Sequence, residues 1–200
     1  MKLLYIKEMS YKYIKFANKI GGKMEELVKK AKNGDKEAFT ELMLLLKADL
    51  YKIAKTRLKN DDDIYDVIQE TMLLAFHSIR KLKQVESFKS WIIKILINRS
   101  NSMYKKKSKS NIISLEEIEN YKSENCFSIE NIEETLDFKC ICENLKYEDR
   151  IIITLFYIED FTDKEIGKIL NLKENTVKTK RTRIKEKIKN NMKKGEEVNG

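Results

Sequence analysis

The chain has 200 residues, enough for one large domain or two small ones, and 42% of them are apolar, which suffices for a core. A charged fraction of 36%, a net charge of +9, no proline and only 6 glycines favour long helices over collagen, β-sandwich or disulfide scaffolds. No apolar stretch approaches the roughly 20 residues that span a bilayer, and no secretion signal is visible, so we expect a cytoplasmic protein without membrane insertion.

The first half of the chain predicts four helices, at about 24–32, after Asp35, at 63–82 and at 88–104. Asp35 and Ser87 are the expected N-caps of the second and fourth helices. Apolar residues at helical spacing predict the buried sides of the second and third helices. These residues are Phe39, Leu42, Met43, Leu46, Leu50, Ile53 and Ala54, and then Ile64, Val67, Ile68, Thr71, Leu74, Ala75 and Ile79.

The second half begins with a polar, acidic and weakly periodic stretch, which predicts a linker at 110–137. A very apolar helix follows at 150–158. Thr162 and Glu165 then form a capping box for a helix at 163–170, and a basic helix runs from about 174 to 189. Helix, short turn and basic helix are the helix-turn-helix pattern. We therefore expect an all-α fold of two small helical domains joined by an acidic linker.

The helix-turn-helix pattern also predicts buried and exposed faces. Gly167 would let the two helices cross closely, and the small core that locks them would consist of Ile166, Ile169, Leu170, Leu172, Val177 and Ile184. The outer face keeps Lys178, Thr179, Lys180 and Arg183, whose cations and hydroxyl suit phosphate and base-edge contacts in a major groove. An ordinary helical hairpin with a basic face is the alternative.

Charge is divided into blocks along the chain. Ten Lys or Arg residues and one acid lie in 80–109, and eight Lys or Arg residues and two acids lie in 173–189. Eight acids and one Lys occupy the intervening 110–137. A single basic run is usually a solvated helix face. Two runs on separate modules indicate two polyanion-binding surfaces.

Motifs for catalysis and metal binding are missing from the sequence. The three cysteines, Cys126, Cys140 and Cys142, lie far from the single histidine, His77, so reduced thiols are a better interpretation than a zinc site. The acidic run 61–63 suits a helix start better than a Mg²⁺ site. No Walker, dinucleotide-binding, zincin or nucleophile-elbow motif occurs. We expect no enzyme activity, no catalytic residue, no metal and no cofactor.

Segments in both modules resemble one family. Residues 161–167 followed by 176–180 are similar to region 4 of bacterial RNA polymerase sigma factors of the extracytoplasmic function (ECF) group in the sigma-70 family. Residues 66–71 resemble the core-binding helix of region 2, and 88–92 with Asn98 resemble the helix after it. The resemblance implies a sigma factor that binds core polymerase and directs promoter-specific initiation. Region 2 would read the −10 element and region 4 the −35 element.

The resemblance implies roles for particular side chains. Polymerase binding falls to Asp66, Gln69 and Glu70, which would dock on the coiled coil of the β′ subunit. The resemblance implies contacts with the −10 element for Lys83, Ser87, Trp91, Lys94, Asn98, Lys105 and Lys106. It places Lys107 and Lys109 beside phosphate. It implies contacts with the −35 element for Lys178, Thr179, Lys180 and Arg183. Phe88 and Trp91, three residues apart on one helix, suit core anchors better than base-stacking platforms.

The resemblance also implies boundaries and partners. Region 2 would cover 24–109, the flexible linker 110–137 and region 4 138–190, with a disordered tail at 191–200. The implied partners are core RNA polymerase (β′ coiled coil and β flap), promoter DNA and an anti-sigma factor, with the free chain monomeric. Turn positions that often hold Gly in the family carry Asp160, Asn171 and Asn175, which tolerate left-handed backbone well enough to keep the turns.

Residues 1–23 form an extension before Met24, where members of this family usually start. A purine-rich codon series for residues 20–23 resembles a ribosome-binding sequence, so we expect translation to start at Met24. A basic amphipathic arm is the alternative for this segment. N-terminal sequencing of the native protein distinguishes the two.

Other functions remain open at the level of sequence. A stand-alone regulator could use the same helix-turn-helix, but it would dimerise to read paired half-sites without polymerase. A sigma-like adaptor would bind polymerase without reading promoters. A nuclease is disfavoured because no paired-carboxylate or histidine constellation occurs.

Overall fold

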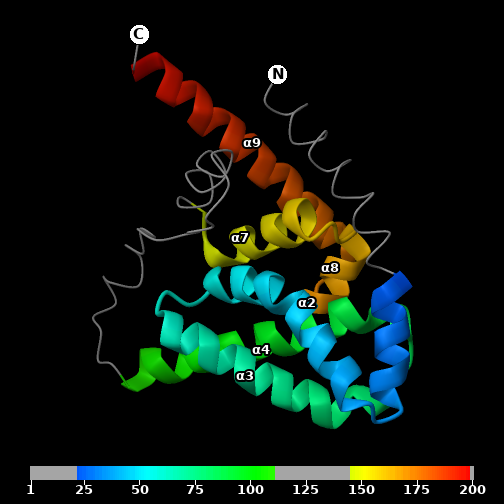
Figure 1. The fold of residues 1–200 in the computed structure, drawn as a ribbon. Coiled ribbons are helices and arrows are strands. Elements are labelled where there is room, and N and C mark those ends of the chain that lie inside the picture. The colour runs from blue at the N-terminus through cyan, green and yellow to red at the C-terminus, as the bar shows by residue number, and fades with distance from the viewer. Residues whose placement is uncertain (1–21, 111–144, 199–200) are drawn as a thin grey trace.

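The computed structural model describes residues 22–110 and 145–198, with side chains as far as 108 in the first range and 188 in the second. Every element in these ranges is helical, which confirms the all-α fold class (Figure 1). The expected extension before Met24, the acidic linker and the three cysteines lie almost wholly outside the described residues. No helix in the described ranges is long and apolar enough to cross a membrane.

The N-terminal module packs its helices around one apolar core. Its elements are a helix at 22–32, α2 (Lys36–Lys55), α3 (Asp61–Ser78), two short 3-10 turns, η1 (Ile79–Lys81) and η2 (Val85–Ser87), and α4 (Phe88–Ser110). Extensive contacts join α2, α3 and α4, which lie side by side in Figure 1. The Asp35 carboxylate accepts a hydrogen bond from the Ala38 amide (2.9 Å), as predicted for the α2 N-cap.

The acidic run at 61–63 forms the first turn of α3. Asn60 is the N-cap, and the three aspartates occupy the first turn, where the helix dipole favours negative charge. Asp63 pairs with Lys107 of α4 (2.6 Å), and Asp61 accepts a hydrogen bond from the Tyr51 hydroxyl (2.9 Å). No group of three or more metal-binding side chains occurs in the described part of the chain.

The predicted apolar stripes are buried except for Leu74 in the first module and, in the second, Leu172 and the half-buried Leu170. All seven predicted residues of α2 are buried, and α3 buries its set except Leu74, which is 37% exposed. Leu74 comes one residue before Ala75, and Ala75 takes the inward position. In the C-terminal module Leu172 is 36% exposed because it lies in the turn after the first helix, beyond the helical register of Ile166 and Ile169.

The C-terminal module is a helix-turn-helix preceded by a third helix. It consists of α7 (Tyr147–Ile153), a π-helical segment (Thr154–Ile158), α8 (Asp163–Leu170) and α9 (Glu174–Val198). The capping box is confirmed: the Glu165 amide donates to Thr162 Oγ1 (3.3 Å), and the Thr162 amide donates to Glu165 Oε2 (2.9 Å). Beyond residue 190, α9 continues to Val198, so most of the expected disordered tail is helical, consistent with its Lys and Glu content and lack of proline.

Two turns of this module use left-handed backbone, as the sequence predicts. Asp160 (φ 56°) and Asn171 (φ 57°) are the two non-glycine residues of the described ranges with positive φ, whereas Asn175 is helical inside α9. Gly167 fits the close crossing of α8 against the turn. A Cβ added there would lie 2.7 Å from the Leu172 carbonyl oxygen.

Candidate polymerase and nucleic-acid interfaces

The first candidate surface lies on α3. Asp66, Gln69 and Glu70 are all exposed and share one side of the helix, while Val67 and Ile68 point into the core. The same side continues to Leu73, which is 62% exposed. A row of acidic and amide groups that ends in an exposed apolar residue suits a protein partner with basic and apolar groups.

The second candidate surface lies on α4 and the turn before it. Lys94, Asn98 and Lys105 recur at helical spacing and are exposed, as are Lys83 before the helix and Lys106 in its last turns. Ser87 is half-buried, and its hydroxyl hydrogen-bonds to Gln84 Oε1 (3.3 Å) just before α4 begins. The structure thus brings most of the predicted −10 residues to one surface. Lys107, expected beside phosphate, instead pairs with Asp63.

The two aromatic residues at the start of α4 differ in environment. Phe88 is 1% exposed and confirmed as a core residue. Trp91 is half-buried, and its ring lies 5.8 Å from that of Phe88. Lys94 and Asn98 come three and seven residues after Trp91, so all three side chains lie on the same side of α4.

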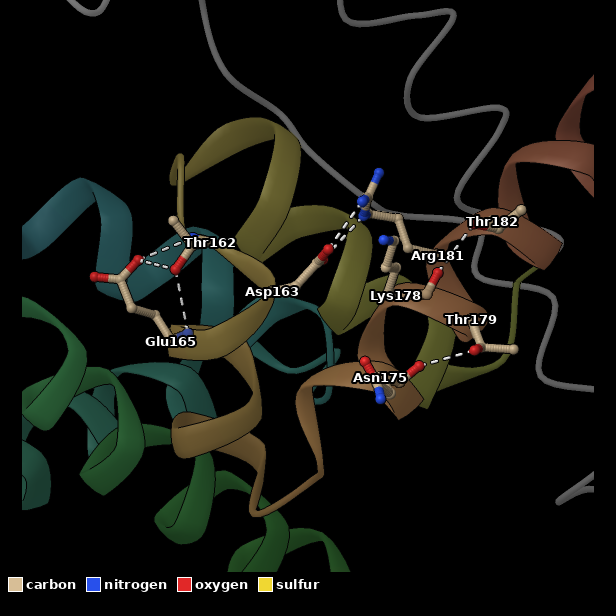
Figure 2. Close-up of polar contacts among 8 residues, drawn as sticks. All are labelled: Thr162, Asp163, Glu165, Asn175, Lys178, Thr179, Arg181 and Thr182. Carbon is tan, nitrogen blue, oxygen red and sulfur yellow. Dashed lines mark hydrogen bonds and ion pairs between the residues drawn. The ribbon is translucent and has the colours of Figure 1, made fainter.

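The third candidate surface is the outer side of α9. Lys178, Thr179 and Arg183 are exposed there, and Lys180 is half-buried beside the inward Val177. The Thr179 hydroxyl donates to the Asn175 carbonyl (2.8 Å), which leaves its oxygen lone pairs and its methyl group to face a ligand (Figure 2). Cations beside such a group can hold phosphate and contact base edges.

Sequence reasoning missed one cation of α9. Arg181 forms two parallel hydrogen bonds with Asp163 at the start of α8, both at 2.9 Å (Figure 2). A signal was present in the sequence, because Arg181 comes four residues after Val177 and three before Ile184, both fully inward. That spacing places it on the buried stripe of α9.

The second set of residues that the sequence did not reveal lies between the modules. The Arg57 guanidinium stands between the rings of Tyr104 (3.7 Å) in α4 and Tyr147 (4.1 Å) in α7. Arg150 of α7 donates to the Thr56 carbonyl (3.3 Å). Contacts between α4 and α8 include a hydrogen bond from Lys94 Nζ to the Lys168 carbonyl (2.8 Å), and together these contacts form what we call the module boundary.

The module boundary also holds a buried charge cluster. Glu159, whose side chain is 1% exposed, pairs through Oε2 with Lys89 (2.8 Å), and Asp49 lies 3.4 Å from the same ammonium. Burial raises the pKa of the Glu159 carboxyl, and the Asp49 charge adds to this, although Lys89 opposes it. Burial alone would lower the pKa of Lys89, but the two carboxylates outweigh burial and raise it.

A Glu159→Gln variant tests this electrostatic arrangement. Because the carboxyl has a raised pKa in the folded chain, the folded state binds the proton more readily than the unfolded state. Its contribution to the free energy of unfolding is therefore fully present below the ordinary carboxyl pKa and is lost as pH rises through the raised value. We expect urea unfolding at a series of pH values above the ordinary carboxyl pKa to show this loss in the wild type and a flatter profile in Glu159→Gln. Glu148→Gln, at an exposed position of α7, is the control. A wild-type pH profile retained in Glu159→Gln contradicts the prediction.

Comparison with protein families finds matches in both modules. The family model for Sigma-70 region 2 matches residues 42–110, and the model for Sigma-70, region 4 matches residues 135–188. The two matched segments contain the three candidate surfaces, with α3 and α4 in the first and α8 and the first part of α9 in the second.

Curated relatives and solved structures agree with these matches. The chain is 32% identical over 136 residues to the RNA polymerase sigma factor SigV of Bacillus subtilis (strain 168), which covers 67% of this chain and 78% of SigV. It is 25% identical over 179 residues to the ECF RNA polymerase sigma factor SigW of the same strain, covering 83% and 95% of the two chains.

Two solved structures share the fold. One is CnrH in complex with the cytosolic domain of CnrY, with a TM-score of 0.62 and 19% identity over 85% of this chain and 97% of that one. The other is the sigma factor RpoE in complex with the anti-sigma factor NepR from Bartonella quintana, with a TM-score of 0.61 and 20% identity over 78% and 96%.

Proposed function

Since the chain belongs to the ECF group of the sigma-70 family and, as a non-enzymatic sigma factor, directs promoter recognition by RNA polymerase through regions 2 and 4, we propose that α3 binds the polymerase while α4 and α9 read the promoter. The observation that carries this proposal is the exposure of one acidic and two basic side-chain rows on these three helices. In this proposal α4 serves the −10 element and α9 the −35 element.

The polymerase contact is assigned to Asp66, Gln69 and Glu70. Two carboxylates and an amide can accept and donate hydrogen bonds to a basic partner helix, and charge-assisted hydrogen bonds of this kind are the strong ones. The adjacent exposed Leu73 adds an apolar contact. The proposed partner is the basic coiled coil of the β′ subunit, and the β flap is the proposed partner of the C-terminal module.

The promoter contacts divide between phosphate and bases. Lys105 and Lys106 at the end of α4 would bind phosphate, which adds affinity without sequence information. Trp91, Lys94 and Asn98 would face the melted strand at −10, where stacking and edge hydrogen bonds offset the cost of unstacking a base. Neither helix is expected to bind tightly alone, and polymerase would supply specificity by holding both readers at a fixed spacing.

Run-off transcription tests the proposal directly. Core polymerase of the source bacterium is incubated with and without the full chain on a pool of genomic promoter fragments that includes the DNA upstream of the chain's own gene. We expect new discrete transcripts that depend on both a −10 and a −35 element in each template. No transcript, combined with dimeric DNA binding in the absence of polymerase, would overturn the proposal in favour of a stand-alone regulator.

Lys178→Ala tests the assignment of α9. Removing one cation that contacts a base edge should weaken holoenzyme binding to the cognate promoter by about 1–3 kcal/mol and relax specificity at one −35 position. The measurement is binding to fragments with single substitutions across the −35 element. Lys187→Ala, at an exposed position one turn beyond the last proposed reader, Arg183, should leave the sequence preference unchanged. An unaltered preference in Lys178→Ala argues against base contact by this side chain.

An anti-sigma factor is the remaining proposed partner. One of the two fold relatives was solved with an anti-sigma factor, and we extend such a partner to this chain, which we propose to be monomeric and cytoplasmic. To silence the proposed function it has to cover the α3 row or the two reading helices. Its binding to the full chain should then compete with core polymerase in a pull-down assay.

A further inference from the structure

One arginine of the proposed −35 helix points away from the DNA side. The Arg181 guanidinium bonds to the Asp163 carboxylate through both ends of its fork, Nε to Oδ1 and one terminal nitrogen to Oδ2, each at 2.9 Å. Figure 2 shows this pair between α8 and α9, with Thr179 directed elsewhere. Arg181 and Asp163 side chains are only 22% and 15% exposed.

Two further features hold the pair in place. The guanidinium lies 4.0 Å from the centre of the Phe156 ring, so the π-helical segment before α8 supports its flat face. Asp163 is the first residue of α8, directly after the Thr162 cap, where the helix dipole favours a negative charge. The hydrogen bonds to Asp163 raise the pKa of Arg181, outweighing its partial burial.

This pair supplies a second anchor between the two helices. The first anchor is the close approach of Gly167 to the Leu172 carbonyl, next to the turn. The buried side chains of Val177 and Ile184 hold α9 against the rest of the module, but apolar packing is non-directional, whereas a polar contact two turns along α9 fixes its direction. A bidentate arginine–carboxylate pair suits this task because the planar fork sets orientation as well as distance.

We propose that Arg181 is a positioning residue that fixes the angle of α9 through Asp163 and Phe156, and so aims Lys178, Thr179 and Arg183 at the −35 bases. It makes no DNA contact itself. The inference rests on the proposed function of α9. It adds that one cation of this helix, Arg181, does not read DNA. It separates Arg181 from Arg183, two residues further on, which is exposed on the outer side.

The test measures binding of the holoenzyme, full chain plus core polymerase, to a cognate promoter and to the same fragment with its −35 element replaced, at several KCl concentrations. A phosphate contact contributes close to one unit to the slope of log K against log salt. We therefore expect Arg181→Leu to keep the wild-type slope but to lower the preference for the cognate fragment by about tenfold, which corresponds to about 1.4 kcal/mol. Lys106→Leu, at an exposed position proposed to bind phosphate, is the control for the slope and should lower it by about one on both fragments.

Rescue separates positioning from general damage. Arg181→Lys keeps the charge without the fork and should restore the preference only in part. The exchange Asp163→Arg with Arg181→Asp rebuilds the pair in reverse and should recover more of the preference than either single change. Far-UV circular dichroism and thermal unfolding check that each variant folds. If Arg181→Leu fails to fold, Asp163→Asn replaces it, and the same loss of preference at unchanged slope is expected.

Three results would overturn the inference or its premise. A slope lowered by about one in Arg181→Leu, with equal weakening on both fragments, identifies a phosphate contact. A wild-type preference in Arg181→Leu shows that the pair does not aim α9. A wild-type holoenzyme that ignores the −35 replacement overturns the proposed function of α9, and the role of Arg181 with it, whereas the other two outcomes leave that function standing.

Discussion

Run-off transcripts disappear when Asp66 and Gln69 are both changed to alanine. Both side chains are exposed on α3, so the variant keeps its fold, but the polymerase loses a carboxylate and an amide from the centre of the proposed contact. Truncating one partner of a hydrogen-bonded charge pair that becomes buried in an interface costs about 2–5 kcal/mol. We expect binding of core polymerase, measured by fluorescence anisotropy of the labelled chain, to weaken by at least that amount.

The control for this prediction is Glu37→Ala. Glu37 lies exposed in the first turn of α2 and carries the same charge as Asp66, but it lies on another helix than the row that runs from Asp66 to Leu73. The Glu37→Ala variant should bind core polymerase as the wild type does. Normal polymerase binding by the Asp66→Ala/Gln69→Ala variant would remove α3 as the docking helix, whatever its effect on transcription.

Phe88→Ala is expected to give the largest loss of stability of any single change considered. Phe88 is among the largest fully buried side chains and begins α4, where it packs under Trp91. Removing a buried phenylalanine ring costs about 3–5 kcal/mol, because apolar contacts are lost and a cavity remains. Folded domains typically have a free energy of unfolding of about 5–15 kcal/mol, so urea unfolding should shift to a much lower midpoint.

Trp91→Ala is the comparison for Phe88→Ala. Trp91 is half-buried and should cost less stability, while its loss reduces promoter opening, which permanganate footprinting of the melted strand measures. The reverse pattern, in which Phe88→Ala retains stability but fails to open the promoter, would make Phe88 the stacking platform instead.

Local sequence signals predicted most of the helices and their inward faces. The α2 stripe, the α8 capping box and the left-handed turns at Asp160 and Asn171 follow from side-chain period and backbone preference, which act within a few residues. The wrong predictions are Leu74, at the edge of the α3 stripe beside the inward Ala75, and Leu172, in the turn after α8. At the edge of a stripe and beyond the end of a helix, helical period does not determine which side chain faces the core.

The module boundary and the Arg181 pair had no comparable local signal. Arg57 meets Tyr104 and Tyr147 only after the two modules dock, and Arg150 reaches the Thr56 carbonyl across 94 positions of sequence. For Arg181 the helical period indicates an inward position but not its partner, because the pairing depends on how α8 crosses α9. The exposed rows on α3, α4 and α9 were predictable, since the helical period that predicts the buried face of a helix also predicts its exposed face.

The module boundary also determines how easily the two halves of the chain part. Arg57 Nε, Arg150 Nε and Glu159 Oε1 are buried there without a hydrogen-bond partner among the described residues. A buried polar atom without a hydrogen-bond partner costs about 1–3 kcal/mol, which hydration would return when the modules separate. The free energy gained when the two modules dock is therefore much smaller than their stacked rings and ion pairs suggest. A large partner that binds the modules separately can draw them apart at little cost, since rehydration of these three groups assists the opening.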